Sequence, residues 1–242
     1  MDDFFGNTEG IVRRQMVLFF IIDTSGSMEG EKISQVNNAI REVIPDLKGI
    51  GGSDVDLKIA CLKFSGGCSW MHPSPVSVEN FAWDKLVADG VTDFGHACKE
   101  LCDKMSKEKF LSAPSASVAP AIFLMSDGAP TDEYKSGLAA LHQNNWFKNA
   151  IKVAVAIGND ANTDVLKEFT GNSEAVIRVH TPEALRKWIR FMTVTSSQVG
   201  SRSRPMQDGK IESKQDAMIE QIKDLQQTDP DLSQVSTNAD EW

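Results

Sequence analysis

The chain has 242 residues, of which 41% are hydrophobic and 24% are charged, and its formal net charge is −9 at pH 7. These proportions are typical of a globular protein that can bury a substantial core, while the negative balance disfavours nucleic-acid binding, which needs clustered Lys and Arg. No apolar run is long enough to span a bilayer and no signal peptide is apparent, so we expect no membrane partner and a cytoplasmic location.

Apolar runs and helical periodicities alternate along the chain. The predicted strands are 16–22, 55–64, 119–125, 151–157 and 175–179. The predicted helices are 32–46, 95–105, 131–147, 164–169 and 182–195. Strands separated by helices of this length predict an α/β fold, doubly wound, with a mostly parallel central sheet and helices on both faces.

Three local patterns add detail to this fold. Pro45 and the glycines that follow it are expected to end the first helix. The second strand carries polar residues at Asp56 and Lys58, so one of its faces is expected to be half exposed and the strand to lie near an edge of the sheet. Thr131 and Asp132 are expected to cap the helix that follows them.

The two ends of the chain differ in composition from its middle. Residues 1–11 are expected to form a leader, and residues 12–197 a single domain. Residues 198–242 hold five basic and nine acidic residues, so this polar acidic tail carries −4 of the net charge and is expected to be mostly disordered. Within the tail, residues 211–225 carry an apolar stripe that predicts a short helix, either packed on its own domain or free to dock on a partner.

The most informative pattern is the polar group that ends the first strand. Val17 to Ile22 is continuously apolar, as in a strand buried on both faces. Asp23, Ser25 and Ser27 follow it directly. A carboxylate and two hydroxyls supply hard oxygen ligands, which suit Mg²⁺ or Mn²⁺ rather than a soft metal.

Two further residues are predicted to complete this group. Asp127 ends the buried strand 119–125, and Thr92 precedes a predicted helix. Because the carboxyl ends of parallel strands meet at one edge of a sheet, Asp127 is expected to lie beside Asp23, with Thr92 reaching in from a neighbouring loop. The sequence therefore predicts a divalent-metal site formed by Asp23, Ser25, Ser27, Thr92 and Asp127.

These five residues carry a resemblance to a known family. The sequence resembles a von Willebrand factor A-type domain, of Rossmann-like fold, with a metal-ion-dependent adhesion site. Asp23, Ser25 and Ser27 match its D-x-S-x-S motif, Thr92 its separate Thr, and Asp127 its later Asp. The resemblance implies a non-catalytic, metal-dependent protein-binding module in which an Asp or Glu of a protein partner completes the metal shell.

Within that family, the phrases IIDTSGSMEGEKISQVNNAI and LMSDGAPTDEY most resemble bacterial TerY-like proteins of tellurium-resistance clusters. This resemblance implies a regulator in a bacterial stress-response or defence pathway, with a Ser/Thr kinase or a protein phosphatase as partner. The chain lacks the C-terminal metal-binding cysteines that some relatives carry, since its last cysteine is Cys102. An alternative within binding proteins is a substrate adaptor for a MoxR-type AAA+ ATPase.

Two other readings of the residues are weaker. A Mg²⁺-dependent phosphohydrolase of the haloacid dehalogenase type needs a second Asp two residues after the first, and Ser25 stands there. A zinc site at His96, Cys98 and Cys102 fits no usual ligand spacing, because His96 and Cys98 point to different sides of a helix. The sequence therefore predicts no catalytic residues, and reduced cysteines packed as small apolar side chains.

Overall fold

A computed structural model of the chain describes residues 14–49, 55–112, 118–201, 206–207, 210–211, 213–229 and 232. The predicted leader, residues 1–11, lies outside the described residues, and so does most of the predicted tail beyond residue 229. None of the helices in the described ranges combines the length and the apolar character needed to cross a membrane.

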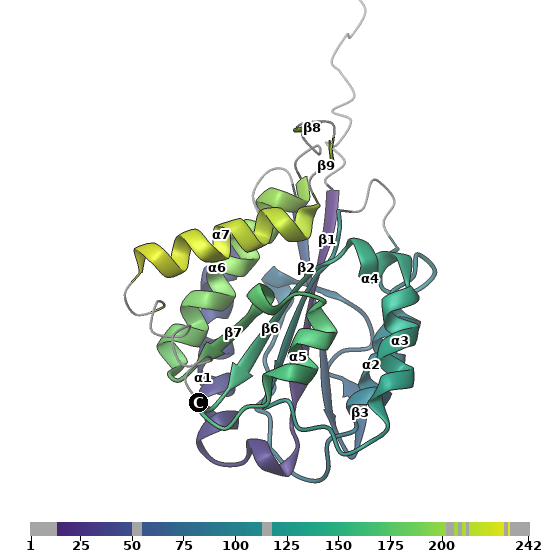
Figure 1. Cartoon of the computed structure of the whole chain (residues 1–242), viewed down its shortest axis with the longest axis vertical. Coiled ribbons are helices and arrows are strands. Elements are labelled where there is room, and N and C mark those ends of the chain that lie inside the picture. Colours follow the sequence, from purple (N-terminus) through teal and green to yellow (C-terminus); the bar gives the residue numbers. More distant parts are fainter. Residues whose placement is uncertain are drawn as a thin grey trace, which may run out of the picture.

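A central sheet with helices on both faces forms the body of the molecule (Figure 1), which confirms the predicted α/β fold. Its strands are β1 (Arg14–Asp23), β2 (Val55–Ser65), β3 (Gly67–Trp70), β4 (Val76–Ser77), β5 (Ala121–Ser126), β6 (Ile151–Ile157) and β7 (Val176–Val179). The order is β3-β2-β1-β5-β6-β7, with β4 also paired to β2. Only β3 and β4 run antiparallel to their neighbour, so β2 does lie next to an edge of the sheet, as predicted.

The helices are α1 (Glu31–Lys48), α2 (Phe94–Lys104), α3 (Tyr134–Gln143), α4 (Asn145–Asn149), α5 (Thr163–Thr170), α6 (Pro182–Ser201) and α7 (Lys214–Thr228). Short 3₁₀ turns span Gly26–Met28, Val78–Asn80 and Ser173–Ala175, and a two-stranded sheet joins β8 (Met206–Gln207) to β9 (Lys210–Ile211).

Several predicted helix boundaries were wrong, and α6, for example, continues to Ser201 rather than ending near residue 195. Helix α1 continues through Pro45 to Lys48, because a proline in the last turn removes only one helical hydrogen bond and Leu47 beyond it is fully buried. The predicted helix 131–147 is two helices, since the side chain of Asn144 accepts hydrogen bonds from the backbone N–H groups of Trp146 and Phe147 and starts α4 anew.

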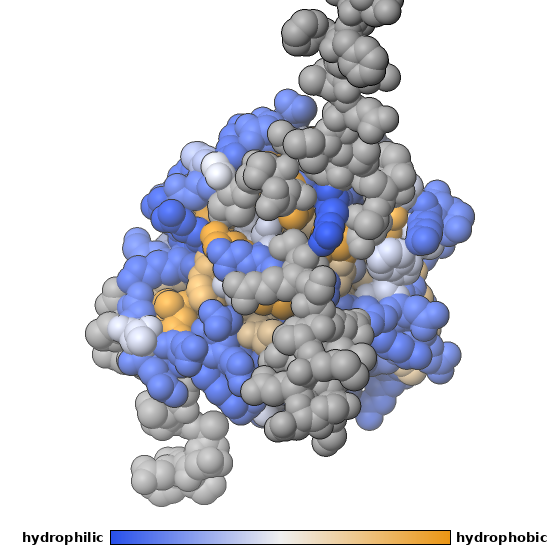
Figure 2. Space-filling view, turned by 90° about the horizontal axis from the view of Figure 1, so that it is seen from above, coloured by the Kyte–Doolittle hydropathy of each residue, from blue (hydrophilic) through white to orange (hydrophobic). Residues whose placement is uncertain are grey.

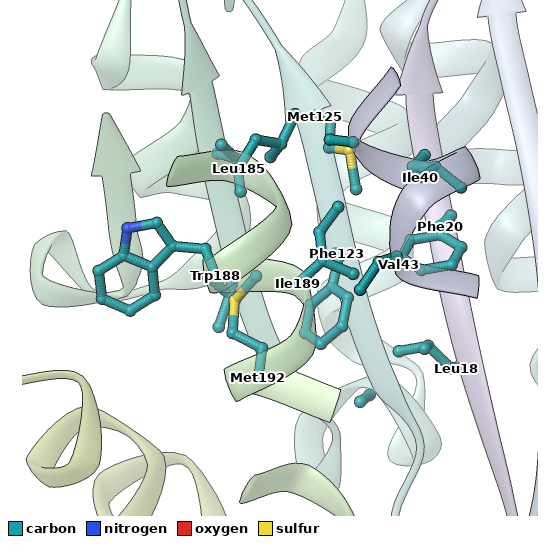
Figure 3. Close-up of a cluster of buried hydrophobic side chains, with 14 of the residues drawn as sticks. Leu18, Phe20, Ile40, Val43, Phe123, Met125, Leu185, Trp188, Ile189 and Met192 are labelled. Atoms are coloured by element: carbon teal, nitrogen blue, oxygen red, sulfur yellow. The ribbon is translucent and has the colours of Figure 1, made fainter. Parts of the chain in front are cut away.

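Alternate residues of β1 face two separate apolar cores. Leu18 and Phe20 point toward α1 and α6 (Figure 3), whereas Phe19 and Ile21 belong to the core under α2, α3 and α5. All four side chains are at most 1% exposed. This double burial explains why β1 reads as an unbroken apolar run, and it fixes where the strand must end.

The sheet reverses its winding between β1 and β5, which are paired in parallel. After β1 the chain passes to α1 on one face, and after β5 it passes to α3 on the other. The two loops therefore diverge at the carboxyl ends of neighbouring strands, the position at which open α/β sheets bind ligands. Figure 2 views the molecule from above, away from this edge, and shows hydrophilic residues around most of the periphery with hydrophobic residues toward the middle.

Helix α7 lies within the segment predicted as an acidic tail, and it packs on the domain. Met218 and Ile222 are fully buried in the core that α1 and α6 also line. The side-chain amide of Gln215 accepts a hydrogen bond of 2.7 Å from the backbone N–H of Lys152 and donates one of 2.9 Å to its carbonyl. Gln215 thus imitates a neighbouring strand where β6 extends beyond β7, which favours the packed alternative over a free docking arm.

We expect Ile222→Ala to lower the free energy of unfolding by about 2–4 kcal/mol, because it leaves a cavity between α7 and the domain. Urea denaturation of the whole chain measures this change. The matched control is Gln221→Ala, an exposed residue of the same helix, for which we expect almost no change. Equal stability of both variants and the wild type would show that α7 is not docked in solution.

Candidate metal centre

Asp23, the last residue of β1, has a completely buried carboxylate. Its Oδ1 accepts a hydrogen bond of 2.9 Å from the backbone N–H of Ser25, and its Oδ2 one of 2.6 Å from the hydroxyl of Ser126 on β5. Burial raises the pKa of Asp23, the hydrogen bonds from Ser126 and Ser25 oppose that rise, and the negative charge of Asp127 adds to it. The site therefore begins with a charge that is costly to keep buried.

Ser25 and Ser27 lie in the turn that leaves β1. Their Oγ atoms are 3.0 Å apart, which brings the two predicted hydroxyl ligands together. Ser25 is 1% exposed, whereas Ser27 is exposed to solvent. The pair therefore connects the buried carboxylate of Asp23 to the surface of the molecule.

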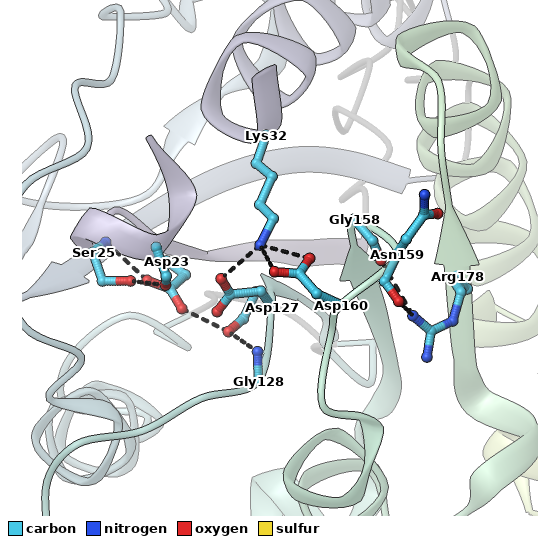
Figure 4. Close-up of polar contacts among 11 residues, drawn as sticks. Asp23, Ser25, Lys32, Asp127, Gly128, Gly158, Asn159, Asp160 and Arg178 are labelled. Carbon is cyan, nitrogen blue, oxygen red and sulfur yellow. Dashed lines mark hydrogen bonds and ion pairs between the residues drawn. The ribbon is translucent and has the colours of Figure 1, made fainter. Parts of the chain in front are cut away.

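Asp127 follows β5, beside Asp23 (Figure 4), and is 4% exposed. Its Oδ2 lies 3.1 Å from the Nζ of Lys32, whereas its Oδ1 is buried without a hydrogen-bond partner. A buried carboxylate oxygen in that state is costly unless something else coordinates it. The next residue must be Gly128, since its φ is +73° and a Cβ there would lie 1.9 Å from the carbonyl oxygen of Asn162.

Thr92 belongs to the segment 81–93, which contains no helix or strand. The N–H of Asp89 donates to the carbonyl of Thr24 at 2.8 Å, and the carbonyl of Gly90 accepts from Gly26 at 2.9 Å. These two bonds hold the segment against the turn that carries Ser25. Thr92 is only 4% exposed.

Thr131 and Asp132 hold Thr92 from the other side. The backbone N–H of Thr92 donates to the Thr131 hydroxyl at 2.9 Å, and the Thr92 carbonyl accepts from the Thr131 N–H at 3.0 Å. Asp132 Oδ2 accepts hydrogen bonds from the N–H groups of Gly95 and His96, at the start of α2. The prediction that Thr131 and Asp132 cap the following helix was wrong: Glu133 accepts from Ser136 at the start of α3.

Hydrogen bonds link Asp23 to Ser25 and Ser25 to Ser27, and Asp127 lies beside Asp23. The backbone next to Thr92 is bonded to the turn that carries Ser25. The structure describes no group of three or more His, Cys, Asp or Glu side chains that could hold a metal in residues 14–49, 55–112, 118–201 or 213–229. A divalent cation here would therefore rest on two carboxylates and on hydroxyls. The unpartnered Oδ1 of Asp127 fits such a cation, which would also relieve the repulsion between Asp127 and Asp23.

The cysteines lie apart from this centre. Cys61 and Cys98 are buried, Cys68 and Cys102 are partly buried, and all four are free thiols. Burial raises the pKa of Cys61 to about 12 and that of Cys68 to about 11. These thiols stay protonated at neutral pH and pack as apolar side chains.

Sequence analysis missed three residues that shape the centre, namely Lys32, Ser126 and Asn37. Lys32 pairs with Asp127 across 95 positions of the chain, and Ser126 bonds to Asp23 across 103. Asn37 holds the irregular segment through Leu86, donating to its carbonyl and accepting from its N–H. Of these three, only Asn37 could have been noticed in the sequence, because it is a polar residue four positions after Ile33, on the apolar face of a predicted helix.

This fold and this centre define a class of α/β domain with an oxygen-rich site at the point where the sheet reverses. A family model described as the von Willebrand factor type A domain matches residues 18–190, and the chain belongs to that family. Inter-alpha-trypsin inhibitor heavy chain H4 of Sus scrofa is 32% identical over 122 residues, and that of Homo sapiens is 31% identical over 133. These matches cover 47% and 51% of this chain but only 12% and 13% of the relatives.

Solved structures share the fold at low sequence identity. A von Willebrand factor type A protein from Catenulispora acidiphila has a TM-score of 0.53 and 20% identity, covering 76% of this chain and 43% of that one. The ArnB paralog VWA2 from Sulfolobus acidocaldarius has a TM-score of 0.54 and 18% identity, covering 73% and 44%. Proximal thread matrix protein 1 of the mussel byssus, with a zinc-occupied MIDAS motif, has a TM-score of 0.56 and 14% identity, covering 76% and 48%.

We expect Asp23→Asn to raise the melting temperature of the protein in EDTA at pH 7, by roughly 2–4 °C for each kcal/mol gained. The pKa of Asp23 is higher in the folded than in the unfolded chain, so its ionisation lowers stability as pH rises above the unfolded value of about 3.9. Thermal unfolding followed by circular dichroism measures the effect. A lower melting temperature for the variant would mean that the bonds from Ser126 and Ser25 outweigh burial.

We expect Asp132→Ala to lower the free energy of unfolding by about 1 kcal/mol, because the start of α2 loses its acceptor. The same change is expected to weaken Mn²⁺ binding, since Thr92 lies just before that helix. Glu133→Ala is the matched control, because it removes the acceptor of α3 and leaves the Thr92 segment intact. Calorimetric titration with Mn²⁺ checks both variants, and equal affinities would refute the link between Asp132 and Thr92.

Proposed function

We propose that this chain is a non-catalytic, divalent-metal-dependent protein-binding module. In this proposal Asp23, Ser25, Ser27, Thr92 and Asp127 hold Mg²⁺ or Mn²⁺, directly or through water. The three hydroxyls add no charge, and a carboxylate that acts through water binds the metal weakly, so one coordination position stays free for an Asp or Glu carboxylate from a protein partner. The chain's own residues orient the cation and keep one side of it open.

The observation that carries this proposal is the pair of buried carboxylates at the ends of β1 and β5, where the sheet reverses its winding. Asp23 is fully buried with a raised pKa, and Asp127 has a buried oxygen without a hydrogen-bond partner. Both features lower stability unless a cation is bound. The mussel byssus protein supports the same chemistry, since its MIDAS motif is occupied by zinc. Hydroxyl and carboxylate ligands favour Mg²⁺ or Mn²⁺ in this chain.

The segment that carries Thr92 suggests which apolar contacts accompany the partner's carboxylate. Val87 is 75% exposed and Val91 is 52% exposed, and both belong to the segment that carries Thr92. Exposed aliphatic side chains in that segment suit a partner that presents an acidic residue flanked by apolar ones. The partner's apolar contacts would then add affinity to the single bond with the metal.

Hydrolysis is the candidate of another class, and nothing in the site favours it. A phosphohydrolase would need an acid two residues after Asp23, but Ser25 stands there with its hydroxyl against that of Ser27. The proposal therefore assigns no catalytic residue.

The wider role follows from the TerY-like resemblance alone. We propose a regulator in a bacterial stress-response or defence pathway, located in the cytoplasm, with a Ser/Thr kinase or a protein phosphatase as partner. An adaptor for a MoxR-type AAA+ ATPase is the alternative partner class, and the same site would serve it. The net charge of −9 disfavours nucleic acid as the ligand.

The test is an affinity capture from a native lysate with Mg²⁺, with EDTA, and with two variants. We expect a partner to be retained by the wild type with Mg²⁺ and lost with EDTA, with Asp127→Ala and with Ser27→Ala. Ser27 is exposed, so removal of its hydroxyl is not expected to disturb folding. A partner retained under all four conditions would move recognition to another surface and reject the proposal.

A further inference from the structure

Lys32 places a fixed positive charge against the centre. It lies in the first turn of α1, and its Nζ is 3.1 Å from Asp127 and 2.9 Å from Asp160 (Figure 4). Side-chain exposure is 17% for Lys32 and 4% for Asp127, but 73% for Asp160. The contact with Asp127 is thus shielded from water, whereas the contact with Asp160 is largely hydrated and weaker.

The surrounding fold makes room for this lysine. Gly158 has a φ of +91°, and a Cβ there would lie 2.6 Å from Lys32 Cε, so a larger residue would displace the side chain. Arg178 holds the same loop by donating to the carbonyls of Gly158, Asn159 and Ala161 at 3.1–3.2 Å. The position of Asp160, and with it the path of Lys32, is therefore fixed from β7.

Lys32 engages only one of the two oxygens of Asp127. The other, Oδ1, is buried without a hydrogen-bond partner and remains available to a cation. Asp23 and Asp127 together carry two negative charges, which a divalent cation would neutralise. Lys32 then adds a positive charge in a region shielded from water, and the exposed Asp160 offsets it only in part, so the loaded centre attracts an anion.

We propose that Lys32 is a specificity-determining residue that weakens cation binding but makes the loaded centre attract carboxylates. This inference rests on the proposed function and adds to it the reason why the centre selects an anionic partner. A purely structural role is the competing explanation, in which Lys32 only ties α1 to the loop of Asp160. The two explanations predict different behaviour when each end of the contact is removed.

The experiment is calorimetric titration of the full chain with Mn²⁺. We expect Lys32→Met to bind Mn²⁺ at least about tenfold more tightly, because a nearby positive charge is gone. Asp160→Asn is expected to bind Mn²⁺ less tightly than the wild type, since it removes a negative charge and leaves Lys32 in place. A structural tie would instead make both variants change in the same direction, and that result would overturn the proposal.

Further variants guard against loss of folding and against a general charge effect. Lys32→Gln removes the charge but keeps a hydrogen-bond donor, and it is expected to behave as Lys32→Met does. Lys109→Met removes a lysine that pairs with Asp103 on the surface, and it is expected to leave Mn²⁺ affinity unchanged. Unchanged or weaker Mn²⁺ binding by both Lys32 variants would also overturn the proposal.

The second measurement follows acetate binding to the Mn²⁺-loaded protein by the relaxation of water protons. We expect acetate to bind the loaded Lys32→Met variant several-fold more weakly than the loaded wild type, although the metal itself is held more tightly. Equal or tighter acetate binding by the variant would overturn the inference. If the wild type bound no Mn²⁺ or Mg²⁺, the proposed function itself would fail, which is a different result.

Discussion

The hydrogen bond from the Ser126 hydroxyl to Asp23 Oδ2, 2.6 Å long, holds the centre together. It joins the last residues of β1 and β5, where the chain leaves the sheet toward opposite faces. The same hydroxyl accepts the N–H of Gly128 at 2.8 Å, so one side chain fixes the turn after β1 and the loop after β5. The relative positions of Asp23 and Asp127 therefore depend on this hydroxyl.

This bond exists because both strands are buried on both faces. Asp23 is itself fully buried at the end of β1, so its carboxylate takes its hydrogen bonds from protein groups. Two hydrogen bonds meet part of that demand, and the raised pKa shows that they do not meet all of it. The remaining cost is typical of a functional site, where local stability is given up for a binding property.

The sequence could predict what depends on local pattern, and it failed where distant residues decide. The strands and the D-x-S-x-S motif were readable because a buried strand and its terminal turn are contiguous. Asp127 could be placed beside Asp23 because parallel strands end at one edge of the sheet. The partners of Asp132 and Lys32 could not be read, since Asp132 bonds to Gly95 rather than to its own helix and Lys32 reaches residues 95 and 128 positions away.

The irregular segment that carries Thr92 has a different source of order. Asn37, buried in α1, accepts from the N–H of Leu86 and from the indole of Trp83, and donates to the carbonyls of Leu86 and Ile33. The segment is therefore held in place although it belongs to no helix or strand. A binding surface that is already ordered loses little conformational entropy when a partner arrives. The anchored segment thus reduces the entropy cost of binding, and the buried charges of the centre are relieved when a cation binds. Both features make binding more favourable.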